Sequence, residues 1–149
     1  MSLCAAIGLL PVALAADTFT GSKAGDFDLG QRLVSCAAFY AFASELTADL
    51  NKPAAVEHFQ NLSNGWSIAG MLMLSSGATQ KRFDAKETAA AIRSARLTAL
   101  RAKAEVGGAD ALTAMQTDHA RECDPLVPLQ ENIIATLRQG VTAQGPRKK

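Results

Sequence analysis

Apolar residues recur at helical spacing between residues 29 and 50, where they cover more than half of the circumference of the predicted helix. Residues three and four apart lie on one side of a helix, so this repeat identifies a buried face. The main face consists of Leu29, Leu33, Cys36, Tyr40, Ala43, Thr47 and Leu50, and it is widened by Phe39, Phe42 and Leu46. A helix with so wide an apolar face is covered from two sides, so the stretch predicts the central helix of a bundle.

Four further stretches show helical periodicity, and none shows the sustained alternation that is typical of a strand. The predicted helices span about residues 29–50, 54–75, 85–106, 110–123 and 128–139. The alanine-rich composition favours the same structure, because alanine loses no side-chain entropy when it enters a helix. A length of 149 residues fits one domain. The sequence therefore predicts an all-α domain over residues 17–140, folded as a compact four- to five-helix bundle.

Short polar residues and glycines mark the ends of these helices. We expect Asp26 or Asp28 to cap the first helix, because a carboxylate accepts hydrogen bonds from the free N–H groups of the first turn. The glycine pair at 107–108 separates the third helix from the fourth, and Gly140 is expected to end the last helix. Gly70 lies inside the second helix, where a glycine often marks the close approach of a neighbour; we expect that neighbour to be the first helix.

The first 16 residues have the outline of a secretory signal peptide. An apolar run from Leu3 to Ala15 ends with Ala13 and Ala15 in the A-x-A arrangement that signal peptidase accepts. No lysine or arginine precedes the run, and the alternative is a short buried helix at the start of a cytosolic protein. We expect cleavage before Ala16 or Asp17 and a periplasmic or secreted location. No other segment is long and apolar enough to span a membrane, which takes about 20 residues.

The charge of the chain gives no reason to invoke nucleic acid. The formal net charge is +1, whereas a nucleic-acid binder presents a strongly basic surface. The third predicted helix is locally basic, with Arg93 and Arg96 on related faces, but it lacks aromatic residues that would stack on bases. We predict no nucleic-acid partner, and we retain these two arginines as candidates for binding an anionic partner. Residues 141–149 are polar and basic, and we expect them to be disordered.

Cys36 and Cys123 both lie on predicted buried faces, and we expect them to form a disulfide. The third cysteine, Cys4, belongs to the segment that we expect to be removed, which leaves an even pair. Two buried cysteines in an exported protein most often pair, because oxidising compartments preserve disulfides. The alternative is two buried thiols that pack as small apolar side chains, and a cytosolic location would favour it.

His119 precedes Cys123 by four residues on the same predicted helical face, a spacing that is compatible with metal binding. Imidazole and sulfur ligands suit zinc or copper, and Cys36 would be the third ligand if the bundle brings it close. Such a spacing is also common by accident, and His119 is then an ordinary, partly exposed helix residue. A metal- or redox-active protein using Cys36, His119 and Cys123 is therefore the alternative function, and the main prediction includes no cofactor.

No catalytic motif accompanies these residues. The chain lacks a G-x-S-x-G sequence and a phosphate-binding loop, and its adjacent acid–histidine pairs would point about 100° apart on a helix. A possible apolar pocket or docking groove, whose helical spacing also fits plain core, comprises Trp66, Phe59, Met71 and Met73. We therefore predict a non-catalytic role in which the protein binds a partner protein or a small apolar ligand between helices.

Overall fold

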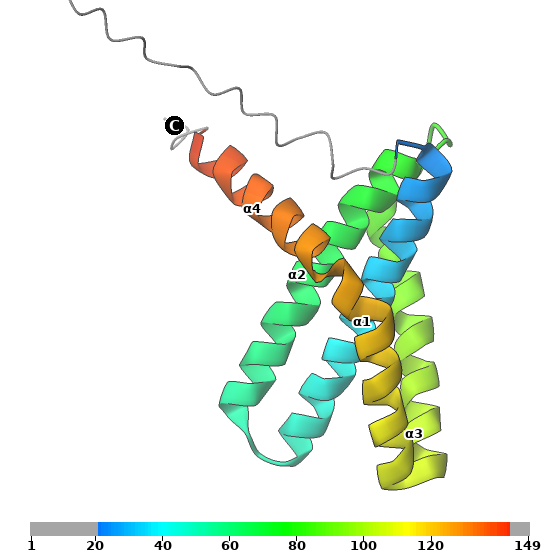
Figure 1. Ribbon diagram of the computed structural model, residues 1–149, viewed down its shortest axis with the longest axis vertical. Helices are drawn as coiled ribbons and strands as arrows, with labels where there is room; N and C mark the ends of the chain where they lie inside the picture. The colour runs from blue at the N-terminus through cyan, green and yellow to red at the C-terminus, as the bar shows by residue number, and fades with distance from the viewer. Residues whose placement is uncertain (1–20, 144–149) are drawn as a thin grey trace, which may run out of the picture.

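The computed structural model describes residues 21–143, and all of the regular structure in this range is helical. The elements are α1 (Lys23–Asp49), α2 (Pro53–Gly77), α3 (Ala85–Cys123), the 3-10 helix η1 (Asp124–Leu126) and α4 (Val127–Ala143) (Figure 1). No strand occurs between residues 21 and 143. The predicted all-α class is therefore confirmed.

The two helices predicted on either side of the glycine pair form one element, α3, that folds back on itself. Gly108 has a φ of 55° and a ψ of −138°, a conformation that glycine adopts at little cost. Arg96 and Glu122 form an ion pair of 3.4 Å, although 26 residues of straight helix would span about 39 Å. The two halves of α3 consequently run antiparallel and side by side (Figure 1).

The number of helices differs from the predicted four to five. Three long elements, α1, α2 and α3, make up the bundle, because α3 unites two of the predicted helices. The last helix, α4, contacts α2, and its C-terminal end extends away from the other helices (Figure 1). The predicted count is therefore wrong, although the predicted class is right.

α1 is the central helix, as its wide apolar face predicts. It contacts α2 on one side and α3 on the other (Figure 1). Its fully or nearly buried residues include Leu33, Val34, Cys36, Ala37, Ala38, Ala41 and Phe42. The buried face ends earlier than predicted, since α1 stops at Asp49 and Leu50 is 64% exposed at the start of the turn to α2.

Two glycines let α1 and α2 approach closely, which confirms the role expected for Gly70. A Cβ atom at Gly70 would lie 2.5 Å from Val34 Cγ2, and one at Gly30 would lie 2.6 Å from the backbone nitrogen of Leu74. Both distances are too short for a real side chain. The Oγ of Ser63 on α2 donates a hydrogen bond of 2.8 Å to the carbonyl oxygen of Ala37 on α1, across the same contact. The tight α1–α2 pair is therefore the rigid framework of the fold.

Ser22 caps α1, and the expectation that Asp26 or Asp28 does so is wrong. The Oγ of Ser22 accepts a hydrogen bond of 3.1 Å from the N–H of Gly25, because the helix begins about a turn earlier than predicted. Asp26 is instead buried, with 5% of its surface exposed. Its carboxylate accepts a hydrogen bond of 2.8 Å from Ser76 Oγ at the end of α2. Asp26 therefore helps to join two helices rather than to start one.

The chain termini lie partly outside the described residues. α4 continues through Gly140 to Ala143, so the predicted stop at this glycine is wrong, and residues 141–143 of the predicted disordered tail are helical. Residues 144–149 of that tail and the predicted signal peptide at 1–16 fall outside the described range. Within residues 21–143, no helix is long and apolar enough to cross a membrane.

Candidate functional site

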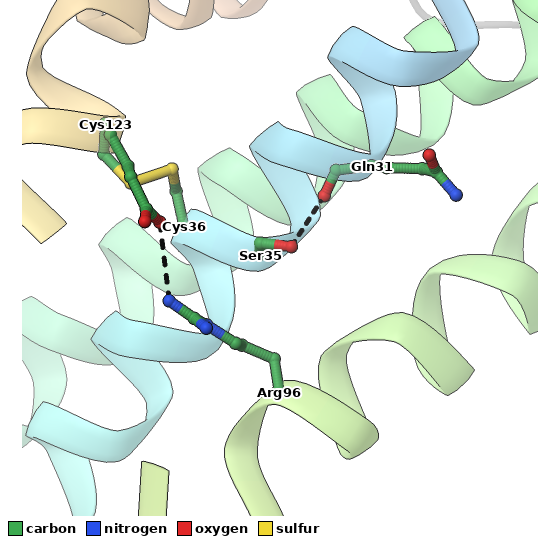
Figure 2. Close-up of a disulfide and its surroundings, with 6 residues drawn as sticks. Gln31, Ser35, Cys36, Arg96 and Cys123 are labelled. Carbon is green, nitrogen blue, oxygen red and sulfur yellow. Dashed lines mark hydrogen bonds and ion pairs between the residues drawn. A yellow bond between two sulfur atoms is a disulfide. The ribbon is translucent and has the colours of Figure 1, made fainter. Parts of the chain in front are cut away.

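The disulfide predicted between Cys36 and Cys123 is present in the structure. The two Sγ atoms lie 2.02 Å apart and the two Cα atoms 5.9 Å apart, and each residue is 3% exposed (Figure 2). Cys36 comes from the middle of α1 and Cys123 from the last position of α3. The bond lies in a core cluster that also contains Leu33, Ala37, Trp66, Ala69, Met73, Leu126 and Ile133. It therefore fastens the end of α3 to the centre of the α1–α2 framework.

His119 lies beside this disulfide and is held by aromatic contacts. Its ring stacks on Phe39, with 3.9 Å between centroids and 10° between planes, and it meets Tyr40 edge to face at 4.8 Å. Its Nε2 atom is buried and has no hydrogen-bond partner within residues 21–143. One ligand atom from each of Cys36, His119 and Cys123 can be chosen so that all three lie within 4.8 Å of one another. The structure thus brings together the three residues that the sequence suggested as possible ligands.

Burial sets the protonation of the rings at this site. Loss of solvent lowers the pKa of His119 below its usual value; Asp124 and Glu122 oppose this effect, and Arg96 adds to it. The imidazole is therefore neutral at pH 7 and has a lone pair on one ring nitrogen. Burial also raises the pKa of the Tyr40 phenol, and the charge of Asp124 acts in the same direction. Both rings consequently remain uncharged around the sulfur atoms.

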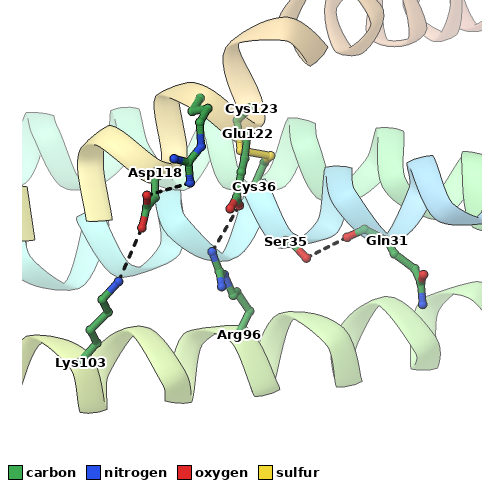
Figure 3. A network of polar contacts seen from close by, with 9 residues as sticks. Gln31, Ser35, Cys36, Arg96, Lys103, Asp118, Glu122 and Cys123 are labelled. Atoms are coloured by element: carbon green, nitrogen blue, oxygen red, sulfur yellow. Dashed lines mark hydrogen bonds and ion pairs between the residues drawn. A yellow bond between two sulfur atoms is a disulfide. The ribbon is translucent and has the colours of Figure 1, made fainter. Parts of the chain in front are cut away.

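A small cavity of about 140 Å³ reaches this group of residues from the side of α3. Its walls include Ser35, Phe39, Arg96, Met115, His119 and Cys123. Ion pairs cross between the two halves of α3 at its edge: Arg96 with Glu122 at 3.4 Å and Lys103 with Asp118 at 3.6 Å (Figure 3). These side chains are about half exposed, so each pair contributes little stability. The charged side chains make one part of the cavity wall polar, whereas Phe39, His119 and Cys123 contribute aromatic rings and sulfur to the rest.

A larger groove of about 660 Å³ lies where the start of α1 meets the end of α2 and the start of α3. Phe27 and Phe83 meet edge to face in its wall, with 5.7 Å between ring centroids. The sequence pattern does not reveal this groove. Phe83 lies in a linker, where no periodicity marks it, and Phe27 lies before the first predicted helix, so neither residue belongs to a recognisable stripe.

The four apolar residues proposed as one binding surface do not form one. Trp66 and Met73 are 2% and 0% exposed and belong to the core around the disulfide. Phe59 is half-buried, and its ring lies 6.5 Å from that of Tyr40. Met71 is half-buried against a different cluster, formed by α1, α2 and the start of α3. The structure therefore assigns most of this set to packing.

The two arginines retained as binding candidates lie at separate hollows. Arg93 is half-buried and lines an open hollow of about 340 Å³ between α1, α2 and α3. Arg96 is exposed and lines the small cavity beside Cys123. The two arginines therefore line different hollows.

The fold and site define an all-α, disulfide-bonded protein with a neutral histidine beside the bond and a separate apolar groove. Comparison of the chain with protein-family models, curated proteins and solved structures finds no match. The sulfur and imidazole group would offer metal ligands only after the disulfide is reduced to thiols, and the groove offers apolar surface with a polar edge.

Proposed function

We propose that this chain is a small exported helical protein with a non-catalytic binding role, and that its ligand is a small apolar molecule. The observation that carries this proposal is the groove of about 660 Å³ at the α1–α2 end of the bundle. Binding sites for small molecules usually enclose about 300–1,000 Å³, and they combine apolar walls with a few polar groups. The groove fits both criteria.

The lining of the groove suits an apolar ligand with one polar end. Phe27 and Phe83 are both half-buried, so part of each ring faces the groove. Small residues, Ala24, Gly77 and Ala78, leave room beside these rings. The polar edge consists of Asp28, Gln31, Thr79, Gln80 and Thr88. Amide and hydroxyl groups in such positions orient a ligand without requiring it to be charged.

The same lining argues against catalysis in the groove. Asp28 is the one ionisable side chain in its wall, and no histidine, cysteine or second carboxylate lies beside it in the lining to act as a nucleophile or as a partner in proton transfer. Export is supported by the Cys36–Cys123 bond, because disulfides persist in oxidising compartments. Intact mass of the protein from its native host tests export: a mature chain starting at Ala16 or Asp17 is expected, and a full-length chain contradicts it.

Binding in the groove is tested by filling it. We expect the fluorescence of anilinonaphthalene sulfonate, an apolar probe with one charged end, to rise when it binds the native protein. Ala78→Trp places an indole in the groove and should abolish the rise. Val106→Trp adds the same ring at a position that is 92% exposed and remote from the groove, so it is the matched control. Equal probe binding by the two variants would contradict the proposed site.

A further inference from the structure

The group formed by Cys36, His119 and Cys123 has the composition of a transition-metal site. Thiolate and neutral imidazole are the ligands that Zn²⁺ prefers in proteins, with Zn–S and Zn–N distances of about 2.3 and 2.0–2.1 Å. In a tetrahedral arrangement, two such ligand atoms lie roughly 3.5–3.8 Å apart. The three ligand atoms already lie within 4.8 Å of one another. The two Sγ atoms are bonded at 2.02 Å, so reduction must first let them separate by roughly 1.5–1.8 Å, which rotation about the side-chain bonds can supply, before they can share an ion.

The positions of the three residues also fit one ion. His119 and Cys123 are one helical turn apart on α3, and Cys36 faces them from α1 with its Cα 5.9 Å from that of Cys123. Phe39 and Tyr40 fix the imidazole ring from its face and its edge. A ligand held in one orientation loses little entropy when it binds.

The surroundings leave room for a fourth ligand, and a ring nitrogen of His119 lacks a hydrogen-bond partner within residues 21–143. The cavity of about 140 Å³ touches both His119 and Cys123 and has room for a water molecule, which occupies about 30 Å³ in the liquid. Nε2 of His119 is buried without a hydrogen-bond partner within residues 21–143, a condition that is unfavourable for a polar atom. Three protein ligands and one open position are characteristic of a zinc site that remains accessible to solvent.

We propose that the reduced form of this protein binds one Zn²⁺ ion through Cys36, His119 and Cys123, so that the disulfide and the metal are alternative links between α1 and α3. The two links exclude each other, because both use the same sulfur atoms. This inference goes beyond the proposed function, since it concerns a different ligand at a different place, and it does not depend on the groove.

Replacement of the disulfide by the metal requires a reductant, and a dithiol supplies the electrons and protons. The reductant transfers two electrons and two protons to the Cys36–Cys123 bond, which breaks into two thiols, and the reductant becomes a disulfide. Zn²⁺ then replaces the two thiol protons, which pass to solvent, and the imidazole of His119 contributes a lone pair. The ion restores the connection between α1 and the end of α3 that reduction removed.

The test uses Co²⁺ as a coloured substitute for Zn²⁺. The full chain is reduced with dithiothreitol, freed of reductant without air and titrated with Co²⁺. We expect thiolate-to-cobalt absorption that saturates at one ion per chain and disappears when Zn²⁺ is added. The oxidised protein should show no such absorption. Absence of the absorption from the reduced protein would overturn the proposal.

Variants identify the ligands. Loss of a residue that merely supports a metal ligand lowers affinity about 10–100-fold, so loss of the ligand itself in His119→Phe should weaken binding by at least about 100-fold. His58→Phe makes the same change at an exposed histidine on α2 and should leave the affinity unaltered. Cys4→Ser should also leave it unaltered, whereas Cys36→Ser should abolish the thiolate absorption. Unchanged affinity in His119→Phe would overturn the three-ligand site.

Thermal unfolding of the reduced protein provides a readout that does not depend on colour. Zn²⁺ should raise the Tm of the reduced wild-type chain and should not raise that of Cys36→Ser. An unchanged Tm of the reduced wild-type chain at saturating Zn²⁺ would show that the ion cannot replace the disulfide, and it would also overturn the proposal.

Discussion

Trp66 is the largest side chain that is fully buried in the described part of the chain, and it belongs to the same core cluster as the disulfide. Its ring lies 6.1 Å from that of Tyr40, which in turn meets His119. A large buried aromatic contributes through the area that it removes from water and through close packing. At the scale of single residues, Trp66 is therefore the main contributor to the packing around the Cys36–Cys123 disulfide.

Trp66→Ala should destabilise the protein by about 3–5 kcal/mol, the range for removing a large buried aromatic side chain. The Tm should fall by at least about 6 °C, since each kcal/mol corresponds to about 2–8 °C for domains of this size range. Val106→Ala is the control, because Val106 is 92% exposed, and its Tm should stay unchanged. A Trp66→Ala protein that melts with the wild type would show that this ring is not part of the core.

The stability of the oxidised, metal-free protein should depend on pH through His119. Burial lowers the pKa of His119 in the folded state below about 6.5, its value in the unfolded chain. The unfolded chain therefore binds the proton more readily, and the free energy of unfolding should decrease as the pH falls through 6.5 towards the lowered pKa. Above pH 7 this histidine should have no further effect.

Urea denaturation of wild type and His119→Phe between pH 5 and 8 measures this dependence. Phenylalanine keeps a ring against Phe39 and does not titrate, so the variant should lose less stability at pH 5 than the wild type. His58→Phe, at an exposed position, should keep the wild-type profile. Parallel profiles for wild type and His119→Phe would contradict the assignment.

At the scale of elements, the contact between α1 and α2 determines the shape of the molecule. It depends on the missing side chains of Gly30 and Gly70, which let the two backbones approach. Helix propensity alone would favour alanine at both positions by about 1 kcal/mol. The sequence identifies Gly70 as an exception to propensity, because a glycine in an otherwise apolar helix indicates a close neighbour. It does not identify Val34 and Gly30 as the neighbours, since their pairing with Gly70 is a matter of helix register.

Gly70→Ala should destabilise the protein by about 1–3 kcal/mol despite the higher helix propensity of alanine. Its Cβ would lie 2.5 Å from Val34 Cγ2 and 3.0 Å from backbone atoms of α1, so the helices would have to separate. Gly140→Ala is the matched control on α4, where nothing lies within 4 Å of the new atom, and it should stabilise by up to about 1 kcal/mol. Thermal melts of both variants measure the difference in sign. A gain in Tm for Gly70→Ala would contradict the close approach.

At the scale of the whole molecule, the Cys36–Cys123 bond closes a loop over most of the domain. The two residues are separated by 87 positions in the sequence, and the loop contains the end of α1, all of α2 and almost all of α3. In the chain-entropy model, closing such a loop in the unfolded state contributes about 4–5 kcal/mol at most. The net stability of a domain is about 5–15 kcal/mol, so the bond is a large share of it.

Reduction of the disulfide should therefore lower the Tm by many degrees in the absence of metal. Cys36→Ser and Cys123→Ser should have similar effects, and the double variant should be no less stable than either single one, because the bond is lost once. Cys4→Ser should leave the Tm unchanged. Non-reducing peptide mapping gives the direct measurement, and free alkylation of both cysteines without reductant would contradict the bond.

The sequence by itself determined the helical class, the central position of α1 and the break in the helix at residues 107–108, and it led to the expectation that Cys36 pairs with Cys123. The helical class, the place of α1 and the break follow from helical periodicity and from backbone preferences, which depend on residues a few positions apart. The expected pairing follows instead from the number of cysteines and the expected compartment. The burial of Asp26, the clamping of His119 by Phe39 and Tyr40, and the groove beside Phe83 were decided by the tertiary structure. Each depends on contacts between segments that are distant in the sequence, so no local pattern records them. The convergence of two sulfur atoms and one imidazole has the same origin: the spacing of His119 and Cys123 suggested it, but only the packing of α3 against α1 produced it.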